Sequence, residues 1–347
     1  MQSFQSVAVV IPAFRPNENL IKLIEQIRRQ FHQTIIVVDD GNQDQSIFAK
    51  LKDVVLLHHQ KNQGKGAALK TAFRYILENL DHIEGVVTAD ADGQHPATDI
   101  QRFVQLLDQD NRPFYMATRT FDRRTPLTNR LGNLITRKIF SWVTGQTLLD
   151  TQNGLRGIPR WLLPSLIKIP QNRYDYEMAM LKDVATQKTT IIQVPTQTIY
   201  AQEGAVSSFK PWKDSVMIYR ILLKSFIRFL FVAVTSFILD YALYLFFYEF
   251  IESSWRVILS VVFARLISGV INYALNRFYS FQSNAKFIKS GLQYLFLFFI
   301  ILTASAFGTD FIVYLGLSHT IAKPLVDMVL FFVSYQVQKR YIFNTPQ

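Results

Sequence analysis

The chain of 347 residues contains no cysteine. Disulfide bonds, cysteine-ligated zinc and thiol nucleophiles are therefore excluded from its chemistry. The first fourteen residues include a short apolar run, but they have no basic flank before it and no small-residue cleavage site, so they do not read as a signal peptide. We therefore expect the first domain to stay on the cytosolic side of a membrane. Basic motifs interleaved with aromatic residues, as in RNA-binding proteins, are also lacking, and we expect no nucleic acid partner.

Apolar and basic residues are both abundant. Hydrophobic residues make up 49% of the chain and include 29 phenylalanines, which is too apolar for an ordinary soluble enzyme. The formal net charge is +11, and the basic residues gather at 119–137 and 210–228, just before the apolar half. We assign them mainly to anionic phosphates and to the headgroups of a lipid bilayer.

Strand and helix patterns alternate in the first half. Runs rich in β-branched residues occur at 7–11, 34–38, 54–58 and 85–89, with amphipathic helical patterns at 19–31 and 66–80. This alternation predicts an α/β domain with a mostly parallel, Rossmann-like sheet. Ligands of such sheets bind outside the carboxyl ends of the strands. We expect the site at that edge, where the pattern places Pro12, Asp39, Asp40, Asp90 and Asp92.

Two acidic residues follow the last of these strands. Asp90 and Asp92 are two positions apart, so their side chains point the same way in an extended segment. Paired carboxylates suit a divalent metal and the phosphates that it binds. The alternative is a simple Asp-Ala-Asp-Gly turn, which the preceding buried strand and the neighbouring Asp40 make less favourable.

Long apolar runs fill the second half. We place four transmembrane helices at residues 226–250, 257–278, 292–315 and 321–341, because about twenty apolar residues cross roughly 30 Å of hydrocarbon. The loop between the second and third carries Arg277, Lys286 and Lys289, whereas the presumed outer loops are short and less basic. Both termini are therefore predicted to face the cytosol. The basic, aromatic segment at 206–225 is predicted to lie along the membrane interface.

The apolar half repeats weakly. Leu-Asp-Tyr at 239–241 parallels Thr-Asp-Phe at 309–311, and residues 276–281 parallel 338–343, which predicts two tandem helical hairpins. Asp240, Arg265, Asp310 and Asp327 lie in or near the spans, where ionisable groups are costly. Structural pairing, contacts in an oligomer and a polar path for a lipid headgroup remain open. Small residues such as Ser268 favour close helix contacts, as in a homo-oligomer.

Four motifs occur in order in the first half: Val-Ile-Pro-Ala-Phe at 10–14, Val-Val-Asp-Asp-Gly at 37–41, Asn-Gln-Gly-Lys-Gly at 62–66, and Asp-Ala-Asp-Gly-Gln-His-Pro at 90–96. They resemble family-two GT-A glycosyltransferases, in particular the polyprenyl-phosphate sugar synthases that include the dolichol-phosphate mannose synthase group. The apolar half is similar to GtrA-like membrane domains. We therefore expect a cytosolic GT-A domain at 1–205, an amphipathic segment at 206–225 and a four-helix transmembrane domain at 226–343, in the cytoplasmic membrane.

The resemblance implies roles for residues of these motifs. A nucleotide-sugar donor would be bound through its base, ribose and diphosphate, and Mg²⁺ or Mn²⁺, which prefer oxygen ligands, would neutralise the leaving group. The implied nucleotide-binding residues are Pro12, Phe14, Glu18, Asp40, Lys65 and Asp90, and the implied metal ligands are Asp92, Gln94 and Asp90. A glycine turn with a solvated lysine is the alternative for Lys65, and His95 is left between a metal ligand, a general base and a structural histidine.

Basic residues after the fourth motif resemble the family's phosphate-binding arginines. Arg119 and Arg130 are the implied catalytic partners of Asp90 and Asp92 and would hold the acceptor phosphate, because arginine matches phosphate bidentately. Arg123 and Arg124 are expected to be solvated or to face headgroups. The second pKa of a phosphate monoester is near 6, so the acceptor is largely dianionic and requires no dedicated general base. No Ser/His or Cys/His arrangement suggests one.

Two further positions are candidates for the sugar site. Asn153 lies in Asp-Thr-Gln-Asn-Gly-Leu-Arg at 150–156, which departs at two positions from the Asp-x-x-Ser-Gly-Phe-Arg pattern of better-known members. Glu177, in Tyr-Asp-Tyr-Glu at 174–177, would face the sugar or the arginines, and a plain carboxylate at a helix N-terminus is the alternative. The identity of the sugar therefore stays open.

The resemblance implies a membrane-bound hexosyltransferase that moves a sugar from a nucleotide sugar, with a UDP-sugar favoured, to undecaprenyl or dolichyl phosphate. Displacement would be in line, with inversion, and the lipid-linked sugar would serve cell-surface glycan modification. One alternative is a processive polysaccharide synthase, whose Gln-x-x-Arg-Trp motif is incomplete here because Gly157 stands where glutamine belongs. The other is a lipid-sugar translocase or scaffold with an attached transferase.

Overall fold

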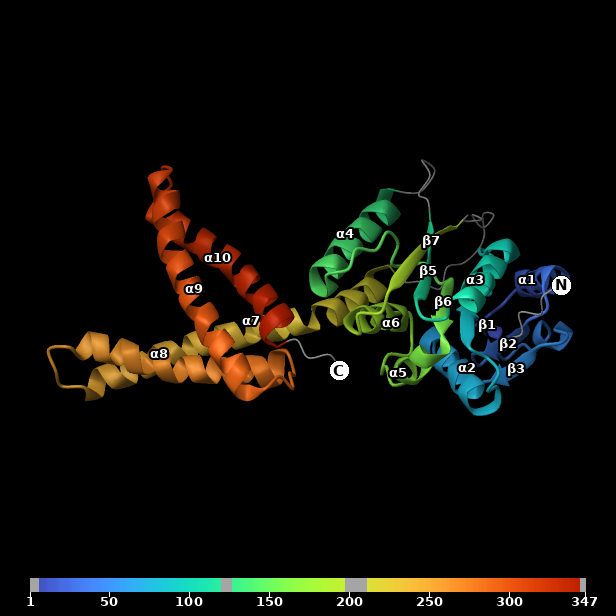
Figure 1. The fold of residues 1–347 in the computed structure, drawn as a ribbon, viewed down its shortest axis with the longest axis horizontal. Coiled ribbons are helices and arrows are strands. Elements are labelled where there is room, and N and C mark those ends of the chain that lie inside the picture. The colour runs from blue at the N-terminus through green and yellow to red at the C-terminus, as the bar shows by residue number, and fades with distance from the viewer. Residues whose placement is uncertain (1–5, 120–126, 197–210, 344–347) are drawn as a thin grey trace. The chain divides into compact units, whose positions relative to one another are not determined.

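The computed structural model of the protein describes residues 6–119, 127–196 and 211–343, with the backbone alone for 127–131 and 211–215. The chain divides into two compact units, residues 1–222 and 223–347. Each unit is therefore considered by itself (Figure 1).

The first unit is built on one sheet. In its described residues seven strands lie in the order β3-β2-β1-β4-β6-β5-β7, and only β6 runs antiparallel to its neighbours. The strands are β1 (Val7–Ala13), β2 (Thr34–Asp39), β3 (Val55–His58), β4 (Gly85–Thr88), β5 (Phe114–Arg119), β6 (Arg156–Pro159) and β7 (Ile191–Thr196). The predicted α/β class and mostly parallel sheet are confirmed.

Helices cover both faces of this sheet, as the continuous burial of its central strands requires. Alternate residues of β1 serve the two faces: Val9 and Ile11 pack in the cluster that contains α1 and α3, whereas Ala8 and Val10 pack in the cluster that contains α2, α5 and α6. The helices are α1 (Glu18–Gln30), α2 (Lys65–Asn79), α3 (Ala97–Gln109), α4 (Leu127–Thr144), α5 (Leu163–Ile167) and α6 (Asp175–Thr186), and the short 3₁₀ turns are η1 (Phe48–Lys50) and η2 (Arg160–Leu162).

The start of α1 shows why the helix forms where the sequence indicates it. The side chain of Asn17 accepts a hydrogen bond from the N–H of Asn19 at the N-cap. Leu20, Leu23 and Ile27 then recur at helical spacing and are buried. The predicted helices at 19–31 and 66–80 are confirmed, each displaced by one residue toward the N-terminus.

The second unit consists of long apolar helices. In the described residues, four helices are long and apolar enough to cross a membrane, over Val216–Phe250, Arg256–Ser280, Phe287–Tyr314 and His319–Ile342. The elements are α7 (Pro211–Phe250), α8 (Arg256–Leu275), η3 (Asn276–Ser280), α9 (Phe287–Tyr314), α10 (His319–Val337) and η4 (Gln338–Ile342). The expected interfacial segment and first span form one helix from Pro211 onward, because nothing between them breaks the helical hydrogen bonding.

The tandem repeat is visible in how the hairpins end. Helices α8 and α10 both pass into π-helical turns, η3 and η4, which begin at the corresponding residues Asn276 and Gln338. The rings of Phe281 and Phe343, which follow the turns, stack with centroids 5.3 Å apart. Both π turns therefore end against one aromatic cluster, as expected for two related hairpins.

Ionisable residues of the spans pair within this unit. The Arg265 guanidinium on α8 lies 3.5 Å from the Asp240 carboxylate on α7, and Ser268 donates to the same carboxylate at 2.7 Å. On α10 the Lys323 ammonium lies 2.9 Å from the Asp327 carboxylate. Structural pairing, one of the readings left open by the sequence, is thus present for these groups.

Candidate active site

Polar side chains gather at the carboxyl ends of the parallel strands. Asp39 ends β2, Asp40 follows it, and Asp90 comes two residues after the end of β4. Because β6 is antiparallel, its first residue lies at this same edge, where Arg156 pairs in register with Thr88 of β4. The expected edge of the sheet therefore carries the charged groups.

Four side chains from different segments contact one another in a chain. The Lys65 ammonium, on the first residue of α2, lies 2.5 Å from Asp90 Oδ1 and 3.0 Å from Glu177 Oε1 in the first turn of α6. On the far side of Asp90, His95 Nε2 lies 3.3 Å from Oδ2. Lys65, Asp90 and Glu177, three of the residues singled out in the sequence, are thus in direct contact.

The ion pairs shift the pKa values of the two partners in opposite directions, each toward its charged form. Burial opposes the charge on Lys65, but Asp90 and Glu177 outweigh it and hold the pKa of Lys65 above its ordinary value. Burial likewise opposes the charge on Asp90, but Lys65 and His95 hold the pKa of that carboxyl below its ordinary value. Lys65 is therefore a fixed ammonium at neutral pH and Asp90 a fixed carboxylate.

Gly154 makes this close approach possible. A Cβ atom at this position would lie 2.6 Å from Asp90 Oδ2 and 3.0 Å from the Lys65 Nζ, too close for either atom. The Gly154 carbonyl accepts a hydrogen bond from the Thr88 hydroxyl at 2.8 Å, which fixes it against β4. Any side chain at this position would displace the Lys65–Asp90 pair.

Asp92 lies beside this chain and is exposed. The Gln94 N–H donates to Asp92 Oδ1 at 3.0 Å, and the Asn19 side chain donates to the Asp92 carbonyl at 3.1 Å. Gly93, between them, has a φ of +77°, which favours glycine. Desolvation and repulsion from Asp90 raise the pKa of Asp92, so a cation bound here would relieve an unfavourable pair of negative charges.

The available oxygen atoms fit a metal that is shared with a substrate. Among the described residues, no three His, Asp or Glu side chains are grouped to hold a metal by themselves. Asp90 is engaged with Lys65, and the other two predicted ligands, Asp92 and Gln94, lie at the same turn and are exposed and half-buried, respectively. Mg²⁺ is commonly bound by one or two carboxylates together with substrate phosphates, and this donor set agrees with that pattern.

Asp40 is occupied by its own loop. Its carboxylate is 2% exposed and accepts hydrogen bonds from His59, Asn62 and the N–H groups of Gln63 and Gly64. The predicted contact between Asp40 and a nucleotide stays a prediction, since the hydrogen bonds that its carboxylate accepts from the described residues all come from residues 59–64.

The other predicted nucleotide-binding residues lie where β1 passes into α1. Pro12 is half-buried in β1, Phe14 is 40% exposed just beyond it, and Glu18 is the exposed first residue of α1. The Arg15 guanidinium lies 5.3 Å from the centre of the Phe14 ring. An accessible ring beside a cation is suited to a base and its phosphates. The nucleotide-binding role of Pro12, Phe14 and Glu18 stays a prediction.

Of the two arginines predicted to bind the acceptor phosphate, only Arg119 has a described side chain. Arg119 ends β5, and its guanidinium bonds the buried Asp150 bidentately, at 2.6 Å from Nε and 3.1 Å from one Nη. Arg130 lies in α4, but its side chain is outside the described residues, as are Arg123 and Arg124. The acceptor-phosphate role of Arg119 and Arg130 therefore stays a prediction.

The motif at 150–156 contributes local hydrogen bonds and a buried arginine that the sequence analysis did not identify. Asn153, a predicted sugar-site residue, is 4% exposed, and its side chain accepts from the Leu155 N–H at 2.9 Å. Arg156 is 1% exposed, and one of its Nη atoms lies 4.0 Å from Glu177 Oε1 with no hydrogen-bond partner among the described residues. The buried arginine extends this chain beyond Glu177, and the sequence analysis gave it no role.

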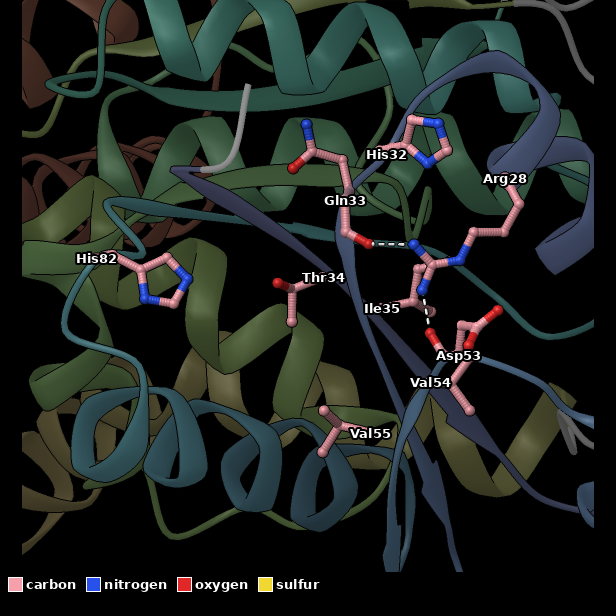
Figure 2. Close-up of a pocket in the computed structure, with 9 residues that line it drawn as sticks. All are labelled: Arg28, His32, Gln33, Thr34, Ile35, Asp53, Val54, Val55 and His82. Atoms are coloured by element: carbon pink, nitrogen blue, oxygen red, sulfur yellow. Dashed lines mark hydrogen bonds between the residues drawn. The ribbon is translucent and has the colours of Figure 1, made fainter. Parts of the chain in front are cut away.

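A separate hollow lies at the opposite edge of the sheet. It has a volume of about 570 Å³ and is lined by residues at the amino ends of β2 and β3 (Figure 2). The Arg28 guanidinium there donates to the backbone carbonyls of Gln33 and Asp53 and so joins two loops. The candidate site lies at the carboxyl ends of the strands, so this hollow is not part of it.

Comparisons with known proteins were made for both units. Residues 8–160 match the model for glycosyl transferase family 2, and residues 228–343 match the GtrA/DPMS transmembrane domain. One relative, from Methanococcus voltae, is a UDP-N-acetylglucosamine–dolichyl-phosphate N-acetylglucosaminyltransferase. It is 26% identical over 62% of this chain and 95% of its own length.

A second relative, from Photorhabdus laumondii, is an undecaprenyl-phosphate 4-deoxy-4-formamido-L-arabinose transferase, 24% identical over 48% of this chain and 53% of its own length. Among solved structures, mannosyl-3-phosphoglycerate synthase from Rubrobacter xylanophilus matches with 17% identity, a TM-score of 0.46, and coverage of 63% of this chain and 73% of that chain. On its two domain matches, the chain is a membrane protein that combines a family 2 glycosyltransferase domain with a GtrA/DPMS transmembrane domain.

Proposed function

We propose that this glycosyltransferase moves a sugar from a nucleotide sugar to a polyprenyl phosphate. The observation that carries the proposal is the Asp90–Lys65–Glu177 group beside Asp92 at the carboxyl edge of the sheet, in a protein whose described residues also include four long apolar helices. The two relatives named above differ in the sugar they transfer, but both names contain a polyprenyl phosphate. The acceptor class is thus better supported than the sugar.

The donor diphosphate fits next to the Lys65 ammonium. Members of this family commonly use a divalent metal, and Mg²⁺ or Mn²⁺ at Asp92 and Gln94 would neutralise the diphosphate as it leaves. Lys65 would add a second positive charge from the protein, held in place by Asp90 and Glu177. Phe14, Pro12 and Glu18 would contact the base and ribose.

The acceptor phosphate needs little activation. With a second pKa near 6 it is largely dianionic at neutral pH, so one of its oxygens can attack the anomeric carbon directly. The bond from that carbon to the acceptor oxygen forms as the bond to the nucleoside diphosphate breaks, with inversion. Arg119 and Arg130 would orient the acceptor phosphate, and the catalytic unit and both termini would face the cytosol. A UDP-sugar is the favoured donor.

The test is sugar transfer in membranes that contain the full chain. Radiolabelled UDP- and GDP-sugars are supplied with Mg²⁺ or Mn²⁺, and lipid-extractable label is measured. We expect one donor to give a mild-acid-labile lipid product and Asp92→Asn to reduce its formation at least about a hundredfold, because the substitution removes a charge from the leaving-group site.

Asp81→Asn provides a matched control. It makes the same chemical change at a side chain that is 97% exposed and paired only with Arg160 in the described residues, at 3.4 Å. We expect this variant to keep wild-type activity, since exposed ion pairs contribute little. Label in a water-soluble polymer, or equal rates for the wild type and Asp92→Asn, would contradict the proposal.

A further inference from the structure

Two neighbouring strands end in matched acid and histidine pairs. Strands β2 and β3 are parallel, and Asp39 lies opposite His58 in their register. Asp39 and His58 are joined at 3.0 Å, and the next residues, Asp40 and His59, are joined at 2.7 Å. The first pair is open, with the His58 side chain 51% exposed, whereas the second is buried, with side chains 3% and 6% exposed. Only the second pair is sealed from solvent.

The Asp40 carboxylate has no acceptor position to spare. Oδ1 accepts from His59 Nδ1 at 2.7 Å and from the Gln63 N–H at 2.9 Å. Oδ2 accepts from the Asn62 side chain and from the Gly64 N–H, both at 2.8 Å. A carboxylate offers about four lone-pair sites, so these four donors use them all. Asp40 therefore acts on the loop that leads into Lys65.

His59 connects the same carboxylate to the body of α2. Because Asp40 can only accept, His59 Nδ1 carries the proton of their hydrogen bond. The other nitrogen, Nε2, lies 2.9 Å from the Thr71 hydroxyl, within α2. In neutral His59 the Thr71 hydroxyl donates to Nε2. The first turn of α2 and a later turn are thus both tied to the end of β2.

The other side of the loop is equally constrained. Gly64 has a φ of +104°, and a Cβ there would lie 2.5 Å from the Asn172 carbonyl oxygen. That carbonyl also accepts from the Ala67 N–H at 3.0 Å. The backbone on both sides of Lys65 is therefore held between Asp40 and residue 172, and the side chain leaves it from a fixed point to reach Asp90 and Glu177.

We propose that Asp40, His59 and Thr71 are positioning residues for Lys65: they fix the first turn of α2 so that the Lys65 ammonium lies between Asp90 and Glu177. This rests on the proposed function, in which Lys65 faces the donor diphosphate. A shift of the loop before α2 would move the Lys65 ammonium away from Asp90 and Glu177, and these carboxylates would then lose their positive partner.

Thr71→Val tests the proposal in the full-length protein. It removes the hydroxyl but keeps the shape of the side chain, and Thr71→Ser restores the hydroxyl. We expect Thr71→Val to lower kcat about three- to tenfold, in line with the loss of one hydrogen bond, and to leave the donor KM within about twofold. Thr71→Ser should keep the wild-type kcat. A rise in donor KM with unchanged kcat would contradict the proposal.

A double-mutant cycle separates positioning from general loosening. In a Lys65→Met background, which has no ammonium to position, Thr71→Val should change the residual rate by less than about twofold. His59→Phe, which removes both histidine bonds, should behave in the same way but with a larger effect in the wild-type background. Equal losses in both backgrounds would show that the bonds only stabilise the fold and would overturn the proposal.

A second readout is independent of sugar transfer. Acetic anhydride labelling of Lys65, followed by mass spectrometry, should be slow in the wild type and several-fold faster in Thr71→Val, while the exposed Lys61 is labelled equally in both. Unchanged Lys65 labelling in folded Thr71→Val would overturn the positioning role. If the wild type transfers no sugar to any lipid phosphate, the proposed function fails, and the labelling still decides the role of these residues.

Discussion

At the scale of single residues, the site depends on one ammonium group between two carboxylates. Lys65 contacts both Asp90 and Glu177, and its pKa is held above the ordinary value by these partners in spite of burial. A fixed positive charge in a partly dehydrated position can interact with a diphosphate without reorganisation of solvent. This is the property that a leaving-group site requires.

Gly154→Ala should disrupt this group directly. The new Cβ would lie 2.6 Å from Asp90 Oδ2 and 3.0 Å from the Lys65 Nζ, so the charged ends of these two side chains must shift. We expect kcat to fall at least about tenfold, as for a misplaced catalytic group, in the membrane transfer assay. Gly132→Ala is the matched control, because a Cβ there meets nothing within 4 Å. An active Gly154→Ala variant would contradict the assigned geometry.

The sequence was sufficient to group some of these residues and not others. Asp90 was placed at the carboxyl edge because it follows a strand, whereas Lys65 and Glu177 were candidates through the family resemblance, each with a structural alternative. The closed hydrogen bonding of Asp40 could not be predicted, because its partner His59 follows a different strand and no local pattern joins the two. Arg156 was likewise not singled out, since its proximity to Glu177 depends on the packing of β6 against α6.

At the scale of elements, α7 belongs to both units. Its early residues Ile218 and Leu222 are 8% and 0% exposed and pack in the core cluster of the first unit. The Ile221 carbonyl accepts from the Lys182 ammonium at 2.7 Å, and the Tyr219 hydroxyl lies 3.3 Å from that of Thr136. The expected boundary at residue 205 would exclude all of these contacts.

A fragment of residues 1–225 should therefore be more stable than one of residues 1–210. Loss of Ile218 and Leu222 from the core removes two buried side chains, each worth about 1.5–3 kcal/mol. Thermal unfolding followed by circular dichroism should show a lower midpoint for the shorter fragment. Equal midpoints would mean that the start of α7 is not part of the core of the first unit.

Polar bonds also join the apolar helices. Asn272 on α8 donates to Ser236 on α7 at 2.8 Å and accepts from Tyr294 on α9 at 2.6 Å and from Asn276 at 2.7 Å. A bond of this kind contributes about 0.6 kcal/mol in membrane proteins. We expect Asn272→Leu, which removes three, to lower the unfolding midpoint in detergent more than Tyr294→Phe, which removes one.

Thr303→Val is a suitable control for these variants. The Thr303 hydroxyl is exposed and donates to the Phe299 carbonyl of its own helix at 2.9 Å, so its loss should leave the midpoint nearly unchanged. If all three variants had the same midpoint, the bonds of Asn272 would not hold the helices together.

Helix and strand positions were predictable wherever periodicity was strong. The helices at 19–31 and 66–80 were displaced by only one residue, because their apolar spacing and caps are local. The third span was expected at 292–315, but α9 begins at Phe287. Its first turn includes Lys289. A prediction based on apolar runs starts after this residue, whereas the helix itself tolerates a lysine near the membrane surface. Helix α7 was predicted as two segments for the same reason, because basic residues occur in its first part.

At the scale of the whole molecule, a family 2 catalytic unit and a GtrA/DPMS transmembrane domain occur in one chain. An enzyme whose acceptor is a lipid phosphate gains from being held at the membrane, because its acceptor is confined there. The basic residues between 213 and 228 lie in the first part of α7 and suit anionic headgroups and phosphates. The chain therefore combines a glycosyltransferase domain with apolar helices that can cross a membrane and with a basic segment at the start of the first of them.

The most direct test of the central claim is the requirement for a lipid phosphate. Full-length protein is supplied with the active nucleotide sugar and either a polyprenyl phosphate or the polyprenol of the same length. We predict transfer to the phosphate alone, because its dianionic oxygen is the nucleophile and the polyprenol hydroxyl carries no charge. Equal transfer to both lipids, or transfer to neither with label in a polymer, would contradict the claim that a polyprenyl phosphate is the acceptor.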